Sequence, residues 1–459
     1  MRYCTAVFLM SACVHTAAGQ EVKVGDKTLK QWAVLLKHSE PRIRYQAVAA
    51  LYAEGAEAAP LVKELMPLLK DTQPLIRRAV AMTLGNCKGD AAPAVPALVA
   101  AMRDSDQAVR QLASQALGEI GASAAPPLIE LLSDKDATIR HYAVLTINGL
   151  GLQSKDIAKA LVKAVKDTSP AVRGAALFAL TKIDTDDADI FALLGAALGD
   201  KEKQVRLSAA SLLVGKGKEA SGTLVKAADD PKVEQRVLAL QTLASLGEEI
   251  DDKGVLALRK ALGDDELRVR QAAALGLANL GKPARELGGG KELFEALTKL
   301  LKEKDAPLRR TAVLALGQLG SDDADEIKTV AGTLKDADAM VRSFTVQALS
   351  RYLKDTESEE NRKELQEHLL GALRDTDRRV QFLAAQTLTQ QTLYVIEPLT
   401  KLVEDGKGMQ RLWAATILGE MGPGALDAVP ALTKMSRDGT PDARRIATLA
   451  LQKIQAEAK

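Results

Sequence analysis

The chain has 459 residues, of which 47% are apolar and only 3% are aromatic. Its 62 Lys and Arg side chains nearly balance its 60 Asp and Glu side chains, so the formal net charge is +2 at pH 7. A protein that holds nucleic acid through the phosphates carries a clear basic excess, because its affinity comes from displaced counterions. The charge balance therefore argues against nucleic acid as a partner.

The first residues have the pattern of an export signal. Arg2 gives a positive start, Thr5 to Val14 form an apolar stretch, and Ala17-Ala18-Gly19 supply the small residues of a cleavage site. An apolar run of about ten residues is too short to span a bilayer, and we predict no transmembrane span elsewhere. The pattern predicts a signal peptide over residues 1–19, a linker over 20–27, and a periplasmic or extracellular location.

A second interpretation of the same segment stays open. Met10-Ser11-Ala12-Cys13 resembles a bacterial lipoprotein box, which would place a lipid anchor at Cys13 and make the protein a membrane-anchored lipoprotein. If cleavage instead falls near Gly19, Cys87 is the remaining cysteine. Because it follows Arg77 by ten residues, as Ile120 follows Arg110, we predict an inert, buried thiol.

A short signature returns along nearly all of the chain: Asp, five residues, then Arg, with Val or Ile usually before the Arg and Leu seven residues after it. Its clearest copy joins Asp104, Arg110 and Leu117. Successive copies are 33, 33, 30, 33, 33, 30, 34, 39, 33, 39, 30 and 33 residues apart. A period in this range is typical of an α-solenoid, in which each repeat stacks on its neighbours. The thirteen register positions are Arg44, Arg77, Arg110, Arg140, Arg173, Arg206, Arg236, Arg270, Arg309, Arg342, Gln381, Arg411 and Arg444.

Each repeat predicts two helices. In the third repeat the first helix begins near Pro93, because proline is tolerated in the first turn. Asp104-Ser105-Asp106 interrupts that helix and offers a cap for the next one. The second helix is expected from about Ala108 to Ile120, with one wide apolar stripe, and Gly121 ends it.

The ends and the longest steps depart from this pattern. We expect the first helix over Leu29 to Lys37 with Trp32 packed inward, and the last over Ala443 to about Ala456. Atypical end repeats cover an otherwise exposed apolar face. The two 39-residue steps predict insertions on one edge, namely a flexible glycine loop at 286–290 and a charged loop at 354–362.

The recurring elements Pro-x-Leu, Leu-x-Asp, Val-Arg, Ala-x-x-Ala-Leu-Gly and Ile-Gly resemble HEAT repeats, in particular the compact subclass first associated with phycobilisome lyases. The resemblance covers about residues 28–456. It implies an all-α fold, a right-handed α-solenoid (superhelix) of about thirteen two-helix repeats over residues 28–459. It does not identify an activity, because this architecture serves scaffolds, transport factors, a few lyases and a few metal hydroxylases.

The Asp and Arg of the signature form a repeated pair. The resemblance implies that they line the turns between paired helices and bond along the stack. Because a pair present in nearly every repeat cannot be one active site, we interpret it as a structural ladder. Its predicted members are Asp71, Arg77, Asp104, Arg110, Asp134, Arg140, Asp167, Arg173, Asp200, Arg206, Asp230, Arg236, Asp264, Arg270, Asp336 and Arg342.

No catalytic or metal-binding pattern stands out. HEAT-type dinuclear iron hydroxylases use several His-Glu pairs, whereas none of His15, His38, His141 and His368 precedes Glu. Gly288-Gly289-Gly290 lacks the Lys-Ser/Thr of a phosphate-binding loop. We therefore predict a non-enzymatic protein with no catalytic residue, no metal and no cofactor. Two alternatives remain, a tetrapyrrole lyase or isomerase and an accessory or sensor subunit of an envelope enzyme.

Because no catalytic or metal-binding pattern is present, we look for a binding function on the surface. In HEAT stacks the second helices line the concave side, so outward residues should follow the register position by one, five and eight. These positions are small, neutral or lightly apolar, which favours a polypeptide over a phosphate backbone. We predict an exported protein-interaction scaffold of the bacterial envelope, with a protein partner on this face or on the inter-repeat loops. The candidate contacts are Tyr45, Arg78, Gln111, Gln115, His141, Phe178, Arg310, Gln347, Phe382 and Gln386.

Overall fold

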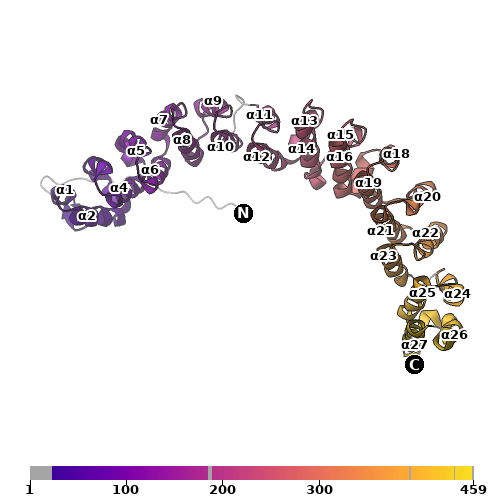
Figure 1. The fold of residues 1–459 in the computed structure, drawn as a ribbon. Coiled ribbons are helices and arrows are strands. Elements are labelled where there is room, and N and C mark those ends of the chain that lie inside the picture. The colour runs from indigo at the N-terminus through magenta and orange to yellow at the C-terminus, as the bar shows by residue number, and fades with distance from the viewer. Residues whose placement is uncertain (1–22, 184–188, 392–393, 439, 457–459) are drawn as a thin grey trace, which may run out of the picture. The chain divides into compact units, whose positions relative to one another are not determined.

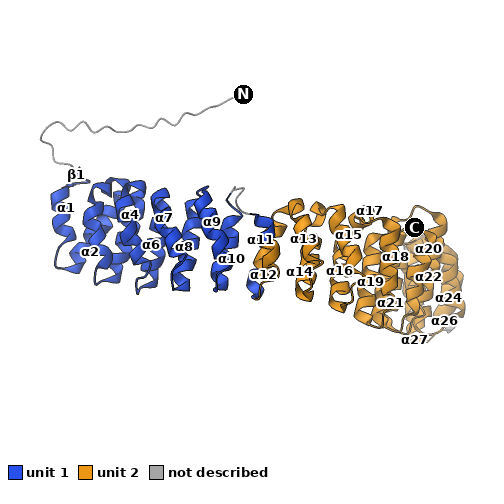
Figure 2. Cartoon of the chain, turned by 90° about the horizontal axis from the view of Figure 1, so that it is seen from above, with its two compact units in different colours: residues 1–193, 202–205 blue, residues 194–201, 206–459 orange. Residues whose placement is uncertain are grey.

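The computed structural model describes residues 23–183, 189–391, 394–438 and 440–456. These residues form 27 α-helices, eight short 3-10 segments and one two-stranded antiparallel pair (Figure 1). The predicted signal peptide and Cys13 lie outside the described residues. The chain divides into two compact units: unit 1 runs to Leu193 and includes Glu202–Val205, and unit 2 holds Leu194–Lys201 and Arg206–Lys459 (Figure 2).

Unit 1 has two helix layers, each built from one helix of every repeat (Figure 1). In the second-helix layer each helix packs on the next: α2 (Pro41–Ala53), α4 (Pro74–Asn86), α6 (Gln107–Ile120), α8 (Ala137–Leu150) and α10 (Pro170–Leu180). The first-helix layer holds α1 (Leu29–Leu36), α3 (Val62–Leu65), α5 (Val95–Ala101), α7 (Ala125–Leu131) and α9 (Lys155–Ala164). The 3-10 segments are η1 (Gly55–Leu61), η2 (Met66–Lys70), η3 (Lys88–Ala94) and η4 (Ala122–Ala124).

Unit 2 repeats this arrangement. Its second-helix layer holds α14 (Val233–Ala244), α16 (Leu267–Leu280), α19 (Ala306–Leu319), α21 (Ala339–Asp355), α23 (Arg378–Thr389), α25 (Met409–Glu420) and α27 (Pro441–Ala456), each packed on the next. The first-helix layer holds α13 (Ser221–Ala227), α15 (Asp252–Ala261), α18 (Gly290–Leu300), α20 (Ala324–Gly332), α22 (Glu359–Ala372), α24 (Ile396–Asp405) and α26 (Val429–Asp438). An extra helix, α17 (Lys282–Leu287), precedes α18, and the 3-10 segments are η5 (Gly217–Ala220), η6 (Gly247–Glu249), η7 (Thr333–Lys335) and η8 (Gly422–Ala428). Helices α11 (Ile190–Ala197) and α12 (Lys203–Val214) contain residues of both units.

The end of the predicted linker is part of the fold. Strands β1 (Lys23–Val24) and β2 (Lys27–Thr28) pair antiparallel just before α1. The buried indole of Trp32 donates its Nε1–H to the Val24 carbonyl oxygen at 2.9 Å, and the Val24 side chain is buried with it. A buried indole N–H needs an acceptor, so Val24 anchors this end of the predicted linker on α1.

Local signals set the helix ends where the sequence indicates them. Asp106 accepts from the Val109 amide at 3.0 Å and caps α6, and Gly121, with φ 89°, ends it. Val109 and Leu117 are fully buried. Apolar spacing therefore gives α6 one buried stripe, as the sequence predicts.

Cys87 lies in the core of unit 1. It is buried, and its thiol donates to the Thr83 carbonyl oxygen at 3.3 Å. Burial raises the pKa of this thiol to about 11. The thiol therefore stays protonated at neutral pH, as expected of an inert core residue.

Glycines let some second helices approach closely. A Cβ built on Gly317 of α19 would lie 2.9 Å from the Ala348 Cα of α21, and one on Gly85 would lie 3.1 Å from the Ala116 Cα. Both glycines follow their register position by eight residues. A larger residue at these positions would push neighbouring repeats apart.

Both insertions were predicted to be loops, and this prediction is wrong because helix forms most of each one. The first contains helix α17, whose Arg285 donates to the Gly320 carbonyl oxygen at 2.8 Å and pairs with Glu326 at 2.9 Å. These contacts hold α17 on the next repeat, so the glycines that follow only turn the chain into α18; Gly289 has φ 73°. At the second insertion α21 extends to Asp355 and α22 begins at Glu359, so helix replaces most of the expected loop.

Candidate protein-binding face

Eight register arginines reach the turn at the start of their own second helix. The Nη1 atom of each donates to the backbone oxygen of the Asp six residues earlier, at distances from 2.8 to 3.0 Å. The bonds join Arg77 to Asp71, Arg110 to Asp104, Arg140 to Asp134, Arg173 to Asp167, Arg206 to Asp200, Arg236 to Asp230, Arg270 to Asp264 and Arg342 to Asp336.

The side-chain partner is the Asp of the following repeat. Arg77 donates from Nε and Nη2 to the two Asp104 carboxylate oxygens, both at 2.7 Å. About nine-tenths of each of these two side chains is buried, at 10% and 11% exposure. A desolvated, charge-assisted pair of this kind contributes about 1.5–3 kcal/mol. Contacts through the same two atoms join Arg44 to Asp71, Arg140 to Asp167, Arg309 to Asp336 and Arg342 to Asp375. Arg236 reaches Asp264 through Nη2 alone at 2.9 Å, and Arg270 lies 3.7 Å from Glu303.

Short repeats lack this contact. No bond joins Arg110 to Asp134 within the described residues, and Asp134 binds Arg103 instead. The step from Arg110 to the next register position, Arg140, is 30 residues, whereas the step from Arg77 to Arg110 is 33. The segment η4 within the shorter step has 3 residues, and η3 within the longer step has 7. Arg206, also followed by a 30-residue step and by the short η5, has no bond to Asp230 in the described part of the chain. A shorter connection therefore removes the contact between repeats.

The ladder Asp closes its own turn rather than capping the helix. Asp104 Oδ1 accepts from the Asp106 amide at 2.8 Å, and Asp106 is the residue that caps α6. Asp336 and Asp338 share these roles at α21. These two turns thus use two aspartates in sequence, one facing the previous repeat and one facing the helix N-terminus.

The pKa values of the ladder carboxylates reflect two opposing effects. Burial raises the pKa of Asp104, but hydrogen bonds from Arg77 and from the Asp106 amide outweigh it, so the pKa lies below its usual value. At Asp336 the hydrogen bond from Arg309 is the largest influence, and it lowers the pKa. The same balance as at Asp104 lowers the pKa of Asp71, Asp167, Asp264 and Asp375.

Exposed apolar side chains gather on the second-helix face, which we define as the residues at the positions one, five and eight after each register that are not buried. The expectation that all of these positions face outward is wrong for Gly85, Ala278, Gly317, Ser343 and Gly419, which are buried. Sixteen large apolar side chains of the described residues are exposed, and nine of them occupy these positions. No repeat carries a charged residue at the fifth or eighth position. A surface with few charges and many large apolar groups is typical of protein-binding sites. The nine are Tyr45, Tyr52, Met82, Leu145, Phe178, Leu207, Leu275, Phe382 and Leu449.

The two arginines among the predicted contacts are already paired. Arg78 Nε donates to the Asp106 carboxylate at 2.9 Å, and Arg310 Nε donates to the Asp338 carboxylate at 2.9 Å. These hydrogen bonds are the largest influence on both carboxylates and lower the pKa of each to about 2. Arg78 and Arg310 therefore support the cap of the next second helix, a role that their sequence position did not indicate.

The other predicted contacts lie on second helices of both units. Tyr45, Gln111 and Gln115 are exposed in unit 1. Exposed Phe178 has the Lys182 Nζ 4.8 Å from its ring centroid. His141 is half-buried, and its Nδ1 has no hydrogen-bond partner among the described residues.

In unit 2, exposed Phe382 stands edge-on to Trp413, with ring centroids 6.0 Å apart. Gln347 and Gln386 line one hollow of about 280 Å³ between α21 and α23. We call it the α21–α23 hollow. No sequence signal predicts this hollow, because a hollow depends on the distance between two helices. It is lined by Val346, Gln347, Ser350, Arg351, Lys354, Leu383, Gln386, Thr387 and Gln390.

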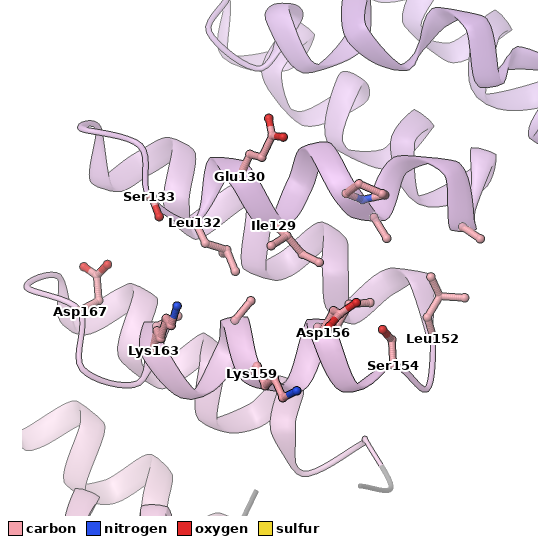
Figure 3. A pocket seen from close by; sticks show the side chains of 16 residues that line it. Ile129, Glu130, Leu132, Ser133, Leu152, Ser154, Asp156, Lys159, Lys163 and Asp167 are labelled. Atoms are coloured by element: carbon pink, nitrogen blue, oxygen red, sulfur yellow. The ribbon is translucent and has the colours of Figure 1, made fainter. Parts of the chain in front are cut away.

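A larger groove of about 750 Å³ lies in the first-helix layer of unit 1, between α7 and α9 (Figure 3). Ile129 of α7 and Leu132 just after it form the apolar wall, and Lys159 and Lys163 lie along α9. None of the described residues that line it is aromatic, histidine or cysteine. It offers no side chain to stack on a flat ring or to ligate a haem iron.

Two further features bear on function. Among the described residues, no three His, Cys, Asp or Glu side chains are grouped as metal ligands would be. Of the helices that the structure describes, none combines the length and the apolar character that crossing a bilayer requires.

Comparison with protein families gives one consistent match. A family model described as HEAT repeats matches residues 29–118, 62–147, 125–214, 294–369 and 366–452. Together these segments cover more than half of the chain. No curated protein matches the chain.

Solved structures with a similar fold include Kap121p, with a TM-score of 0.57, 15% identity, and coverage of 93% of this chain and 53% of that chain. Kap121p bound to RanGTP gives a TM-score of 0.58 at 13% identity, with coverage of 93% and 56%. A structure of Kap95p with RanGDP gives 0.50 at 12% identity, with coverage of 94% and 68%. The chain thus spans about half the length of Kap121p, and at these identities the likeness concerns the fold alone.

Proposed function

Because the chain belongs to the HEAT-repeat family, we propose that it is a non-enzymatic scaffold that binds a polypeptide partner along its second-helix face. The observation that carries the proposal is the gathering of exposed apolar side chains on that face, where the fifth and eighth positions carry no charge. Large apolar and aromatic groups in a neutral setting are the anchors of protein interfaces. A helix or an extended segment of a partner could contact several repeats at once.

The similar structures support this class of partner. Kap121p has been solved bound to Ste12p, to Pho4p and to Nup53p. The overall charge of +2 also argues against a phosphate backbone as the ligand.

We further propose that the protein is exported to a bacterial envelope. The proposal rests on Arg2, the apolar stretch from Thr5 to Val14 and the small residues up to Gly19. The mass of the mature N-terminus tests it: cleavage near Gly19 gives a start at Gln20, and an acylated Cys13 identifies a lipoprotein. A mature protein that retains Met1 would contradict export.

Site-specific photo-crosslinking tests the binding face. A photoreactive phenylalanine placed at Phe178 or Phe382 should capture one polypeptide from an extract of the native cells. Leu256, an exposed apolar residue of first helix α15, is the matched control and should capture nothing specific. Equal labelling from Leu256, or no captured polypeptide from any position in a folded sample, would rule the proposal out.

The tetrapyrrole alternative gains little support from the α7–α9 groove. Its volume falls within the range of about 300–1,000 Å³ of small-molecule sites. Its lining, however, gives a bilin no aromatic side chain to stack on and a haem no axial ligand. A purified sample that becomes coloured on incubation with bilin or haem would favour this alternative over the scaffold.

A further inference from the structure

We infer that the α21–α23 hollow binds an acidic segment of the polypeptide partner, with a partner carboxylate between Arg351 and Lys354. The inference rests on the proposed function, because the hollow opens on the second-helix face of unit 2. It names the chemistry of the partner that the proposed function leaves open.

Charge is the first argument. Arg351 and Lys354 are the two charged residues that line the hollow, and no carboxylate is part of the lining. The nearest acidic residue along the helix, Asp355, pairs with Lys282 at 3.0 Å. The two cations therefore face the hollow without a neutralising partner in it, which favours an anionic ligand.

Hydrogen-bonding capacity is the second argument. Gln347, Gln386 and Gln390 are exposed, and their side-chain amides make no hydrogen bond within the described part of the chain. An amide donates two hydrogen bonds and accepts two, so it can satisfy both the backbone of a peptide and a carboxylate. Arg351 also donates to Gln318 of α19, the second helix before α21.

Size and surroundings are the third argument. A volume of about 280 Å³ lies just below the range of about 300–1,000 Å³ of small-molecule sites, so the hollow suits inserted side chains better than a cofactor. Phe382 lies one helical turn before Gln386 on α23 and is 51% exposed. A partner segment with an apolar residue next to its Asp or Glu would contact Phe382 and the hollow together.

Binding of defined peptides to the full chain tests this inference. Three fluorescent peptides of equal length would carry leucine beside two Glu, two Gln or two Lys. We expect the Glu peptide to bind most tightly, and its affinity to fall as salt is raised. In the double variant Arg351→Glu/Lys354→Glu its affinity should fall by about tenfold or more, because two attractive contacts become repulsive.

Matched variants keep the test decisive. Lys159→Glu/Lys163→Glu makes the same change of charge on α9 of unit 1 and should leave the affinity unchanged. Arg351→Gln/Lys354→Gln should give an intermediate loss and replaces the Glu variant if that one unfolds. Equal binding of the three peptides, or an equal loss in the α9 control, would overturn the inference.

The two proposals can fail separately. If the Phe178 crosslinker captures a partner but the Glu peptide shows no preference, the acidic-segment inference fails alone. If no position captures a polypeptide and no peptide binds, the scaffold proposal fails with it.

Discussion

At the scale of single residues, one arginine connects two repeats. Arg77 donates to the backbone of its own turn through Nη1 and to the Asp104 carboxylate of the next repeat through Nε and Nη2. The planar guanidinium presents its donors in a fixed fork, so a single side chain can satisfy both turns. Lysine could not hold both contacts with the same geometry.

Arg77→Gln should lower the free energy of unfolding by about 1.5–3 kcal/mol, because it removes two charge-assisted hydrogen bonds from a mostly buried carboxylate. Glutamine can keep the contact with its own turn, as Gln381 Nε2 does with the Asp375 carbonyl oxygen at 2.6 Å. Arg110→Gln is the control, because Arg110 has no bond to the next repeat's Asp134 among the described residues. Chemical denaturation followed by circular dichroism measures both, and equal losses would contradict the role of the inter-repeat contact.

The same carboxylates should make stability sensitive to acid. Asp104 and Asp336 have folded-state pKa values below the unfolded value of about 3.9, so the folded state favours their charged form. Their contribution is complete above about pH 4 and is lost as pH falls through the lower, folded pKa values. We expect a steady Tm from pH 7 to 5 and a marked fall below pH 4. Asp104→Asn should flatten part of that fall, and an unchanged pH profile would count against the assignment.

At the scale of helices, the distance between neighbouring second helices is set by small residues. Gly317, Gly85 and Gly419 all follow the register by eight residues and all face an alanine of the next second helix. Gly118 holds the same position in α6, yet a Cβ there would meet nothing within 4 Å. The same position therefore has a different packing role in different repeats.

Gly317→Ala should destabilise the protein by about 1–3 kcal/mol, because the new Cβ would lie 2.7 Å from the Ala348 Cβ and force α19 and α21 apart. Gly118→Ala is the matched control and should stabilise by about 0.5–1 kcal/mol through helix propensity. Thermal unfolding of both variants measures the difference. A stabilising Gly317→Ala would show that the two helices separate at no cost.

At the scale of the whole molecule, stability is a sum of neighbouring terms. In each unit a second helix packs on the second helices before and after it, and a first helix covers the same core. No repeat can bury its apolar stripe alone. A local defect should therefore weaken its neighbours first.

Leu117→Ala removes a fully buried side chain of α6 and should cost about 2–5 kcal/mol. Hydrogen exchange should lose protection first in α4, α6 and α8 of unit 1, while α21, α23 and α25 of unit 2 keep theirs. Uniform loss of protection through both units would mean that the chain unfolds as one cooperative body.

The sequence by itself determined the two-helix repeat, the ends of helices such as α6 and the burial of Cys87 and Trp32. These follow from signals within a dozen residues: apolar spacing, a capping Asp106 and a terminating Gly121. The family match agrees with that pattern over most of the chain. Local signals failed at α17, where contacts of Arg285 with the next repeat stabilise a helix in a segment whose glycines favoured a loop.

Only the tertiary structure decided which groups meet between repeats. The resemblance implied bonds along the stack without naming the partner of each Arg, and in the structure the side chain of Arg77 binds the Asp 27 residues after it. The sequence also did not reveal that Arg78 and Arg310 donate hydrogen bonds to Asp106 and Asp338. Nor did it reveal the hollow between α21 and α23. These contacts depend on the offset between successive repeats, and a connection shorter by a few residues is enough to remove them. Spacing within one repeat carries no information about that offset, so the residues that meet across the stack are set by packing.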